Sequence, residues 1–274
     1  MRLRNPSTLR KIGTGLLALL IASGCGKSSS PTGPITPRTL SLRQALNAAL
    51  PATVPVPANL DTTASVLVTL HLPGGFKGAG AAFLNNGSLV SAGNVWIRTF
   101  NAGALDSVQL AQTVAGGGTL IIYSTLTGAP PPTVNIAFDG IAYHAFRVGG
   151  AGAIAAFVDS AQSVDDINLA SPAVDTTITR SSGLTVAWSD GGSDPTVKVA
   201  VTVVANSDTT LRASAALAVD SDGTAQVSAA ALGALPPGGA KLSVARYRLV
   251  YKMAGGRNTG FACETIEVRN LTLN

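Results

Sequence analysis

Few residues of this 274-residue chain are suited to acid-base chemistry. Its two histidines, His71 and His144, each lie among apolar residues in a segment that alternates like a strand, which is typical of a partly buried structural histidine. The only glutamates are Glu264 and Glu267, and the sequence has no motif of a zinc site, a phosphate-binding loop or a serine nucleophile elbow. It therefore predicts no catalytic residue and no enzyme. The alternative is a hydrolase whose histidine, serine and aspartate come from distant positions.

Two aspartate-rich turns offer oxygen ligands for a calcium ion. "DSDG" contains Asp220 and Asp222, and "SDGGSDP" contains Asp190 and Asp194. "DSDG" lacks the third acid and the later glutamate of a helix-loop-helix calcium site. Aspartate and glycine also tolerate the backbone dihedrals of tight turns, so both segments are interpreted as hairpin turns. We expect neither a metal nor a cofactor.

Aromatic and basic side chains lie in strand-like segments. Trp96 and Trp188 each occupy an apolar segment of period two, which predicts that they anchor a core between two sheets. The alternative, a platform for stacking sugars, needs several exposed rings. Arg246, Arg248 and Lys252 have the even spacing of one strand face, and we interpret that face as solvent-exposed.

The N-terminal residues have the three-part layout of a secretory signal peptide. The apolar run 12–22 is too short to span a membrane, which takes about 20 residues. Small residues follow it and lead to Cys25. The basic residues that precede it are Arg2, Arg4, Arg10 and Lys11.

Ala22-Ser23-Gly24-Cys25 resembles the lipobox of bacterial lipoproteins, with alanine where that family more often has leucine. The resemblance implies that the Cys25 thiol receives a diacylglyceryl group, that the chain is cut before Cys25, and that the new amino group is acylated. Several acyl chains give stable anchoring, whereas one holds a protein only marginally. Gly26, in place of the aspartate that retains such proteins in the inner membrane, implies the outer membrane.

Processing would change the charge and the cysteine count. The formal net charge is +5, but four of the 19 basic residues precede Cys25, so 15 remain against 14 acidic ones. No basic patch indicates nucleic acid as a partner. With Cys25 lipidated, Cys263 has no intramolecular partner for a disulfide, and its strand-like surroundings indicate a small buried thiol.

Beyond the signal the sequence predicts an all-β fold, an antiparallel β-sandwich with one or two short helices. Short segments of period two alternate with glycine-, proline- and aspartate-rich turns. The strands expected from this pattern are 64–72, 93–100, 133–138, 141–148, 176–181, 184–189, 196–204, 211–219, 224–228, 240–253 and 261–273. Helices are expected at 41–50 and 228–235, the second as a plug at one end of the sheets.

We divide the chain into a signal peptide at 1–24, a tether at 25–62, an N-terminal β domain at 63–163 and a C-terminal β-sandwich domain at 164–274. The polar, acidic stretch 162–171 sets the boundary. The alternative is one continuous sandwich whose sheets share strands from both halves. The C-terminal half, from "ITRSSGLTVAWS" to "ALPPGGAKLSVARY", is similar to the tail domains of uncharacterised bacterial envelope lipoproteins, which implies a β-sandwich and no activity.

The sequence as a whole indicates a lipid-anchored protein of the cell envelope with a non-catalytic binding or structural role. Its expected partner is the membrane, reached through the lipid on Cys25, and the sequence names no protein or glycan partner. A glycan-binding or adhesive surface module is the second hypothesis.

Overall fold

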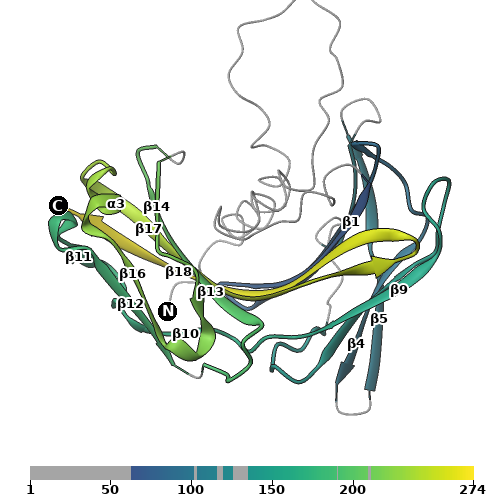
Figure 1. The fold of residues 1–274 in the computed structure, drawn as a ribbon, viewed down its shortest axis with the longest axis horizontal. Helices are drawn as coiled ribbons and strands as arrows, with labels where there is room; N and C mark the ends of the chain where they lie inside the picture. The colour runs from purple at the N-terminus through teal and green to yellow at the C-terminus, as the bar shows by residue number, and fades with distance from the viewer. Residues whose placement is uncertain (1–62, 102–103, 116–119, 126–134, 190, 209–210) are drawn as a thin grey trace, which may run out of the picture.

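The protein folds as a β-sandwich built mainly of antiparallel strands, as the sequence predicts (Figure 1). The computed structural model describes residues 63–274 except 102–103, 116–119, 126–134, 190 and 209–210. The lipidation residue Cys25 and the helix expected at 41–50 lie outside the described residues. No helix in the described ranges is long and apolar enough to cross a membrane.

A long sheet runs through the whole molecule and has eleven strands within the described ranges. Its order is β14-β13-β17-β18-β1-β2-β7-β6, with β15 beside β13, β11 beside β18 and β3 beside β2. The strands are β1 (Ala64–Leu72), β2 (Phe76–Asn85), β3 (Ser88–Leu89), β6 (Ala111–Ala115), β7 (Leu120–Ser124), β11 (Thr176–Ile178), β13 (Val197–Ala205), β14 (Arg212–Ser214), β15 (Ala218–Val219), β17 (Gly238–Ala254) and β18 (Arg257–Leu273).

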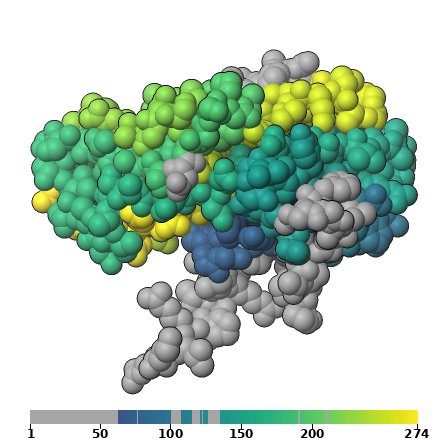
Figure 2. Space-filling model, turned by 90° about the horizontal axis from the view of Figure 1, so that it is seen from below, coloured from purple at the N-terminus to yellow at the C-terminus, as the bar shows by residue number. Residues whose placement is uncertain are grey.

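Two smaller sheets pack on the long one. The four-stranded sheet, in the order β5-β4-β8-β9, consists of β4 (Val95–Asn101), β5 (Ala104–Gln109), β8 (Tyr143–Val148) and β9 (Phe157–Gln162). The three-stranded sheet, in the order β10-β12-β16, consists of β10 (Asn168–Ser171), β12 (Leu184–Ser189) and β16 (Thr224–Val227). Figure 2 shows the resulting elongated molecule from below, with the green strands toward one end, the blue and teal four-stranded sheet toward the other, and the yellow C-terminal strands at both.

Each smaller sheet encloses its own core against the long sheet. Val186 and Trp188 meet Val201 and Leu242 in one core, whereas Ile97 and Phe146 meet Leu67 and Phe261 in the other. Helix α3 (Ala229–Gly233) closes the end of the first core with buried Leu232, and the Ser228 side chain caps its N-terminus by accepting from the Ala231 amide. The expected helix at 228–235 is confirmed.

The β17–β18 hairpin belongs to both sandwiches. Its two strands have 17 residues each and pair along their whole length, so they reach both cores. The long sheet takes strands from both sides of the predicted boundary at 162–171. The division into two domains stays a prediction.

The strands and their pairing differ from the sequence expectations in several places. The sequence does not predict β2, β3, β5, β6, β7, β9 or β10, and the strand expected at 211–219 is divided into β14 and β15. Residues 135–138 of the strand expected at 133–138 are not in a strand. The pairing is also not wholly antiparallel, because β1 runs parallel to β18. Such a pair needs a long connection between its strands, and here nearly the whole described chain provides it.

Candidate functional site

A buried arginine lies where the two sandwiches meet. The inner face of β17 presents Leu242 and Val244 to one core and Val250 to the other, and Arg246 and Arg248 lie between them. Arg246 has no exposed surface and Arg248 is 7% exposed. The prediction that these arginines face solvent is therefore wrong, since β17 is covered on this face along most of its length.

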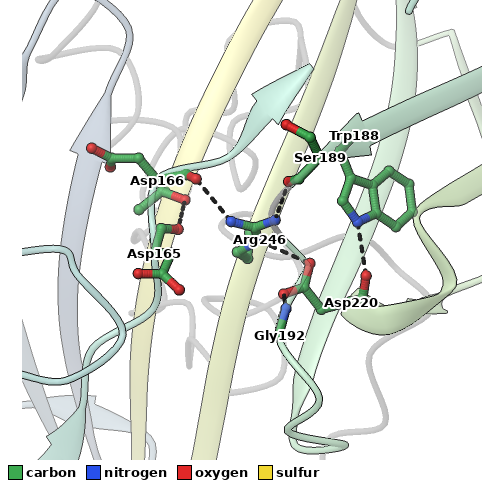
Figure 3. A network of polar contacts seen from close by, with 8 residues as sticks. Asp165, Asp166, Trp188, Ser189, Gly192, Asp220 and Arg246 are labelled. Carbon is green, nitrogen blue, oxygen red and sulfur yellow. Dashed lines mark hydrogen bonds and ion pairs between the residues drawn. The ribbon is translucent and has the colours of Figure 1, made fainter. Parts of the chain in front are cut away.

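The Arg246 guanidinium joins three segments that are distant in sequence (Figure 3). Nε donates to Asp220 Oδ1 at 2.9 Å, Nη1 to the Asp166 carbonyl at 2.8 Å, and Nη2 to the Ser189 carbonyl at 3.0 Å. Neither side chain of the Arg246–Asp220 ion pair is more than 3% exposed. A buried charge needs such partners because it has lost its water.

Hydrogen bonds and two close turns hold Asp220 in position to pair with Arg246. Asp220 Oδ2 accepts from the Gly192 amide at 2.9 Å, and its carbonyl accepts from Trp188 Nε1 at 2.9 Å. The short 3-10 turn η3 (Asp220–Asp222) ends at Gly223 in the left-handed region with φ 67°. At Gly191 a Cβ would lie 2.4 Å from the Asp220 carbonyl oxygen, so only glycine permits this approach of the two turns.

The calcium alternative finds no support in this arrangement. Asp220 is paired with Arg246, and the Asp222 carboxylate accepts from the Val219 amide at 2.9 Å. Within the described ranges no group of three or more metal-ligating side chains occurs. The segment is a turn, as expected, but not a hairpin, because β15 and β16 belong to different sheets.

Arg248 and Lys252 extend the polar contacts along β17. Arg248 Nη2 lies 2.5 Å from Asp194 Oδ2, and Lys252 Nζ lies 2.5 Å from the buried Asp159 carboxylate. Hydrogen bonds from the Thr196 hydroxyl and amide, followed by the nearby Arg248 charge, lower the pKa of Asp194. Asp190, the other aspartate of that predicted turn, lies outside the described residues.

His144 is a buried structural histidine, as its apolar surroundings predict. Nε2 lies 2.8 Å from the Ala137 carbonyl, which can only accept, so Nε2 carries the proton. Nδ1 then accepts from the Thr69 hydroxyl at 2.7 Å, and Cys263 Sγ lies 3.7 Å away. Burial lowers the pKa of His144 to about 4.

We expect His144 to make stability depend on pH in the acid range. Its pKa is about 4 in the folded protein against 6.5 ordinarily, so the unfolded chain binds the proton first and stability falls as the pH drops from 6.5 to 4. The loss is on the order of 3 kcal/mol. Urea unfolding of wild type and His144→Gln across this range measures it. Parallel pH profiles for the two proteins would contradict the assignment.

His71 pairs with Asp166, which lies just before β10. Its Nδ1 forms a hydrogen bond with Asp166 Oδ1, and its ring stacks on Phe138 at 5.5 Å between centroids. Nε2 has no hydrogen-bond partner among the described residues. Both histidines contact the Phe138 ring, His71 in a stacked and His144 in a T-shaped arrangement, but their hydrogen-bond partners differ. The structure therefore does not join the two histidines in one catalytic arrangement.

Cys263, a possible nucleophile, and Glu264, a possible acid, are both buried. Cys263 is a free thiol without exposed surface, which confirms the predicted buried cysteine, and burial raises its pKa to about 12. Glu264 points to the opposite face of β18, beside Leu70 and Tyr247 in a third apolar cluster. Burial raises the pKa of Glu264 to about 8, and its Oε2 has no hydrogen-bond partner.

The two tryptophans have different environments. Trp188 belongs to the core of the C-terminal sandwich, as predicted. Trp96 does not anchor a core, because Val95 and Ile97 of β4 occupy the inward positions and Trp96 points outward, partly exposed. Gln109 on β5 and Arg147 on β8 are directly opposite Trp96.

Trp96 belongs to a continuous surface that we name the outer face of the four-stranded sheet. It is formed by the described side chains that alternate with the core positions of β4, β5, β8 and β9. Tyr143 is 52% exposed and Val158 is 64% exposed on this surface. The outer face comprises Trp96, Arg98, Ser107, Gln109, Tyr143, Ala145, Arg147, Val158, Ser160 and Gln162.

The arginines of the outer face differ in their partners from most other arginines that the structure describes. Arg180, Arg257 and Arg269, like Arg246 and Arg248, donate to carbonyls or carboxylates of the chain. Arg98 and Arg147 have no hydrogen bond or ion pair with a described residue. The buried Nε of Arg98 is unpartnered, as are the Nε atoms of Arg248, Arg257 and Arg269. None of the ten outer-face residues is acidic.

Comparison with known proteins assigns neither a family nor a function to the chain. No family model matches the chain, and no curated protein matches its sequence. Among solved structures, the fibronectin(III)-like modules of Clostridium thermocellum CbhA match with 11% identity and a TM-score of 0.24, covering 75% of this chain and 88% of that one. The FN1-FN3 domains of chicken CNTN1 match with 9% identity and a TM-score of 0.23, covering 72% and 62%.

Proposed function

We propose that the protein is a lipid-anchored binding protein of the cell envelope, attached to the outer membrane through Cys25, without catalytic activity. The observation that carries the anchoring is the order of basic residues, apolar run and Ala22-Ser23-Gly24-Cys25 at the N-terminus. Attachment of two or more acyl chains at this residue holds the protein stably at the bilayer. The segment 26–62 then serves as the tether of the β-sandwich.

The non-catalytic role has support from the chemistry of the candidate residues. The protonated Nε2 of His144 is engaged by a carbonyl, and the pKa of the Cys263 thiol is raised by burial. A thiol that stays protonated is a poor nucleophile. Arg246 and Asp220 form an ion pair, and Arg246 also donates to a backbone carbonyl. These interactions hold segments of the fold together and leave neither side chain free for catalysis.

A glycan-binding or adhesive module is favoured over a purely structural role by the outer face. Trp96 and Tyr143 on this surface provide aromatic rings that are not part of a core. Aromatic side chains with an apolar body and a polar tip are common in recognition surfaces.

Substitution of Cys25 tests the anchor. In a bacterial host that processes lipoproteins, the wild-type chain should incorporate labelled fatty acid and sediment with membranes, whereas Cys25→Ala should carry no label and keep its first 24 residues. Mass spectrometry of the purified chain measures the cleavage. A wild-type protein that is unlabelled and has its full length would contradict the proposal. Cys263→Ala is the matched control and should keep the label.

A further inference from the structure

We infer that the outer face of the four-stranded sheet binds an acidic polysaccharide, with Trp96 and Tyr143 stacking on sugar rings and Arg98 and Arg147 binding their carboxylate groups. This inference rests on the binding role proposed above and names the ligand class and the residues. The surface runs over four strands, and its side chains therefore offer contacts to an extended ligand.

The strand register places the four side chains on one surface. Trp96 and Arg147 are directly opposite on β4 and β8, and Arg98 is opposite Ala145, two residues along. Tyr143 comes two residues further, so the two rings lie about 14 Å apart along the strands, from a rise of about 3.4 Å per residue. Ala145, between them, is 4% exposed and is therefore covered by its neighbours on this face. The arrangement accommodates a run of sugar rings rather than one.

The positive charge of Arg98 and Arg147 favours an acidic ligand. Both arginines are without an acidic partner among the described residues, and the outer face has no carboxylate to compete for an anion. A guanidinium group presents paired N–H donors that match both oxygens of a carboxylate. A neutral glycan offers hydroxyl oxygens to these donors but lacks the charge and the paired oxygens of a carboxylate. Gln109 and Ser107, both exposed, offer neutral donors for hydroxyl groups.

Binding of the full-length protein in detergent micelles to immobilised polygalacturonate tests the inference, with neutral dextran as the comparison. We expect wild type to bind polygalacturonate at least about tenfold more tightly than dextran, a difference of about 1.4 kcal/mol. Added salt should weaken the binding because it screens exposed charges. The double variant Arg98→Gln/Arg147→Gln should lose at least about tenfold in affinity, since the charge-assisted bonds are lost.

The aromatic contribution is tested by Trp96→Ala and separately by Tyr143→Ala, whose exposed ring can be removed without opening a core. Each should weaken binding at least about fivefold if the ring stacks on a sugar. Arg212→Gln is the matched control, because Arg212 is an exposed arginine of β14 in the other sandwich, and it should change nothing. Thermal unfolding verifies that each variant is folded.

Several results would overturn the inference. Absence of wild-type binding to either polysaccharide would exclude the site. Wild-type affinity of the arginine variant for polygalacturonate would exclude it as well. Equal affinity for dextran and polygalacturonate would show that the ligand is not specifically an acidic polysaccharide, although the glycan-binding role would remain. The anchoring of the protein is measured separately through Cys25, so a failure here is distinguishable from a failure of the proposed lipid attachment.

Discussion

Arg246→Met is expected to lower the free energy of unfolding by about 3–5 kcal/mol, the usual cost of removing one partner of a buried ion pair. The methionine fills similar space, but the Asp220 carboxylate stays buried with the Gly192 amide as its remaining donor. The carbonyls of Asp166 and Ser189 also lose the donors that Arg246 provides. Equilibrium unfolding in urea measures the effect.

The double variant Arg246→Met/Asp220→Asn separates the ion pair from the packing. The double variant removes both charges. Its free energy of unfolding should therefore fall by less than the sum of the decreases in the two single variants. Arg212→Met, at an exposed position, should stay within about 0.5 kcal/mol of wild type. A cost below about 1 kcal/mol for Arg246→Met would mean that the junction does not depend on this charge.

Glu264→Gln is expected to stabilise the protein in mildly alkaline solution. The pKa of Glu264 is raised from 4.5 to about 8, so stability is full below pH 4.5 and is lost as the pH rises through 8. The cost of ionising this buried carboxyl is on the order of 5 kcal/mol, and a neutral amide avoids it. Urea unfolding at pH 6 and pH 9 should show a far larger advantage for the variant at pH 9.

Glu267→Gln is the matched control for this measurement. Glu267 is on the same strand, three residues away, and is half-buried. It should change the pH profile little. An equal effect of both substitutions, or a wild-type stability that does not fall between pH 6 and pH 9, would show that Glu264 has access to water when it ionises.

The fold class could be predicted because strand periodicity and turn residues are local. The segments 64–72, 184–189 and 261–273 are strands in the structure, and Ser228 starts the expected helix. Which strand pairs with which is not a local property. The β1–β18 pairing joins Ala64 with Asn258, and the turn 220–223 crosses between sheets instead of closing a hairpin.

The positions of Arg246 and Trp96 could not be predicted because both faces of their strands are apolar in sequence. On β17 the positions that alternate with Arg246 include Tyr247 and Leu249, so alternation alone does not identify the face that meets solvent. On β4 the same ambiguity holds between Trp96 and its neighbours Val95 and Ile97. The acceptors of Arg246 at Asp166 and Ser189 are backbone carbonyls, which leave no side-chain signal.

The parallel pairing of β1 with β18 has a consequence for the order of folding. β1 precedes every other described strand, yet one of its edges is completed only by the last of them. During synthesis the long sheet therefore cannot close until β18 has been made, and contacts of such sequence separation form slowly. For the exported lipoprotein proposed above, this arrangement would delay folding, since the first described strand has no partner on that edge while the rest of the chain is being translated.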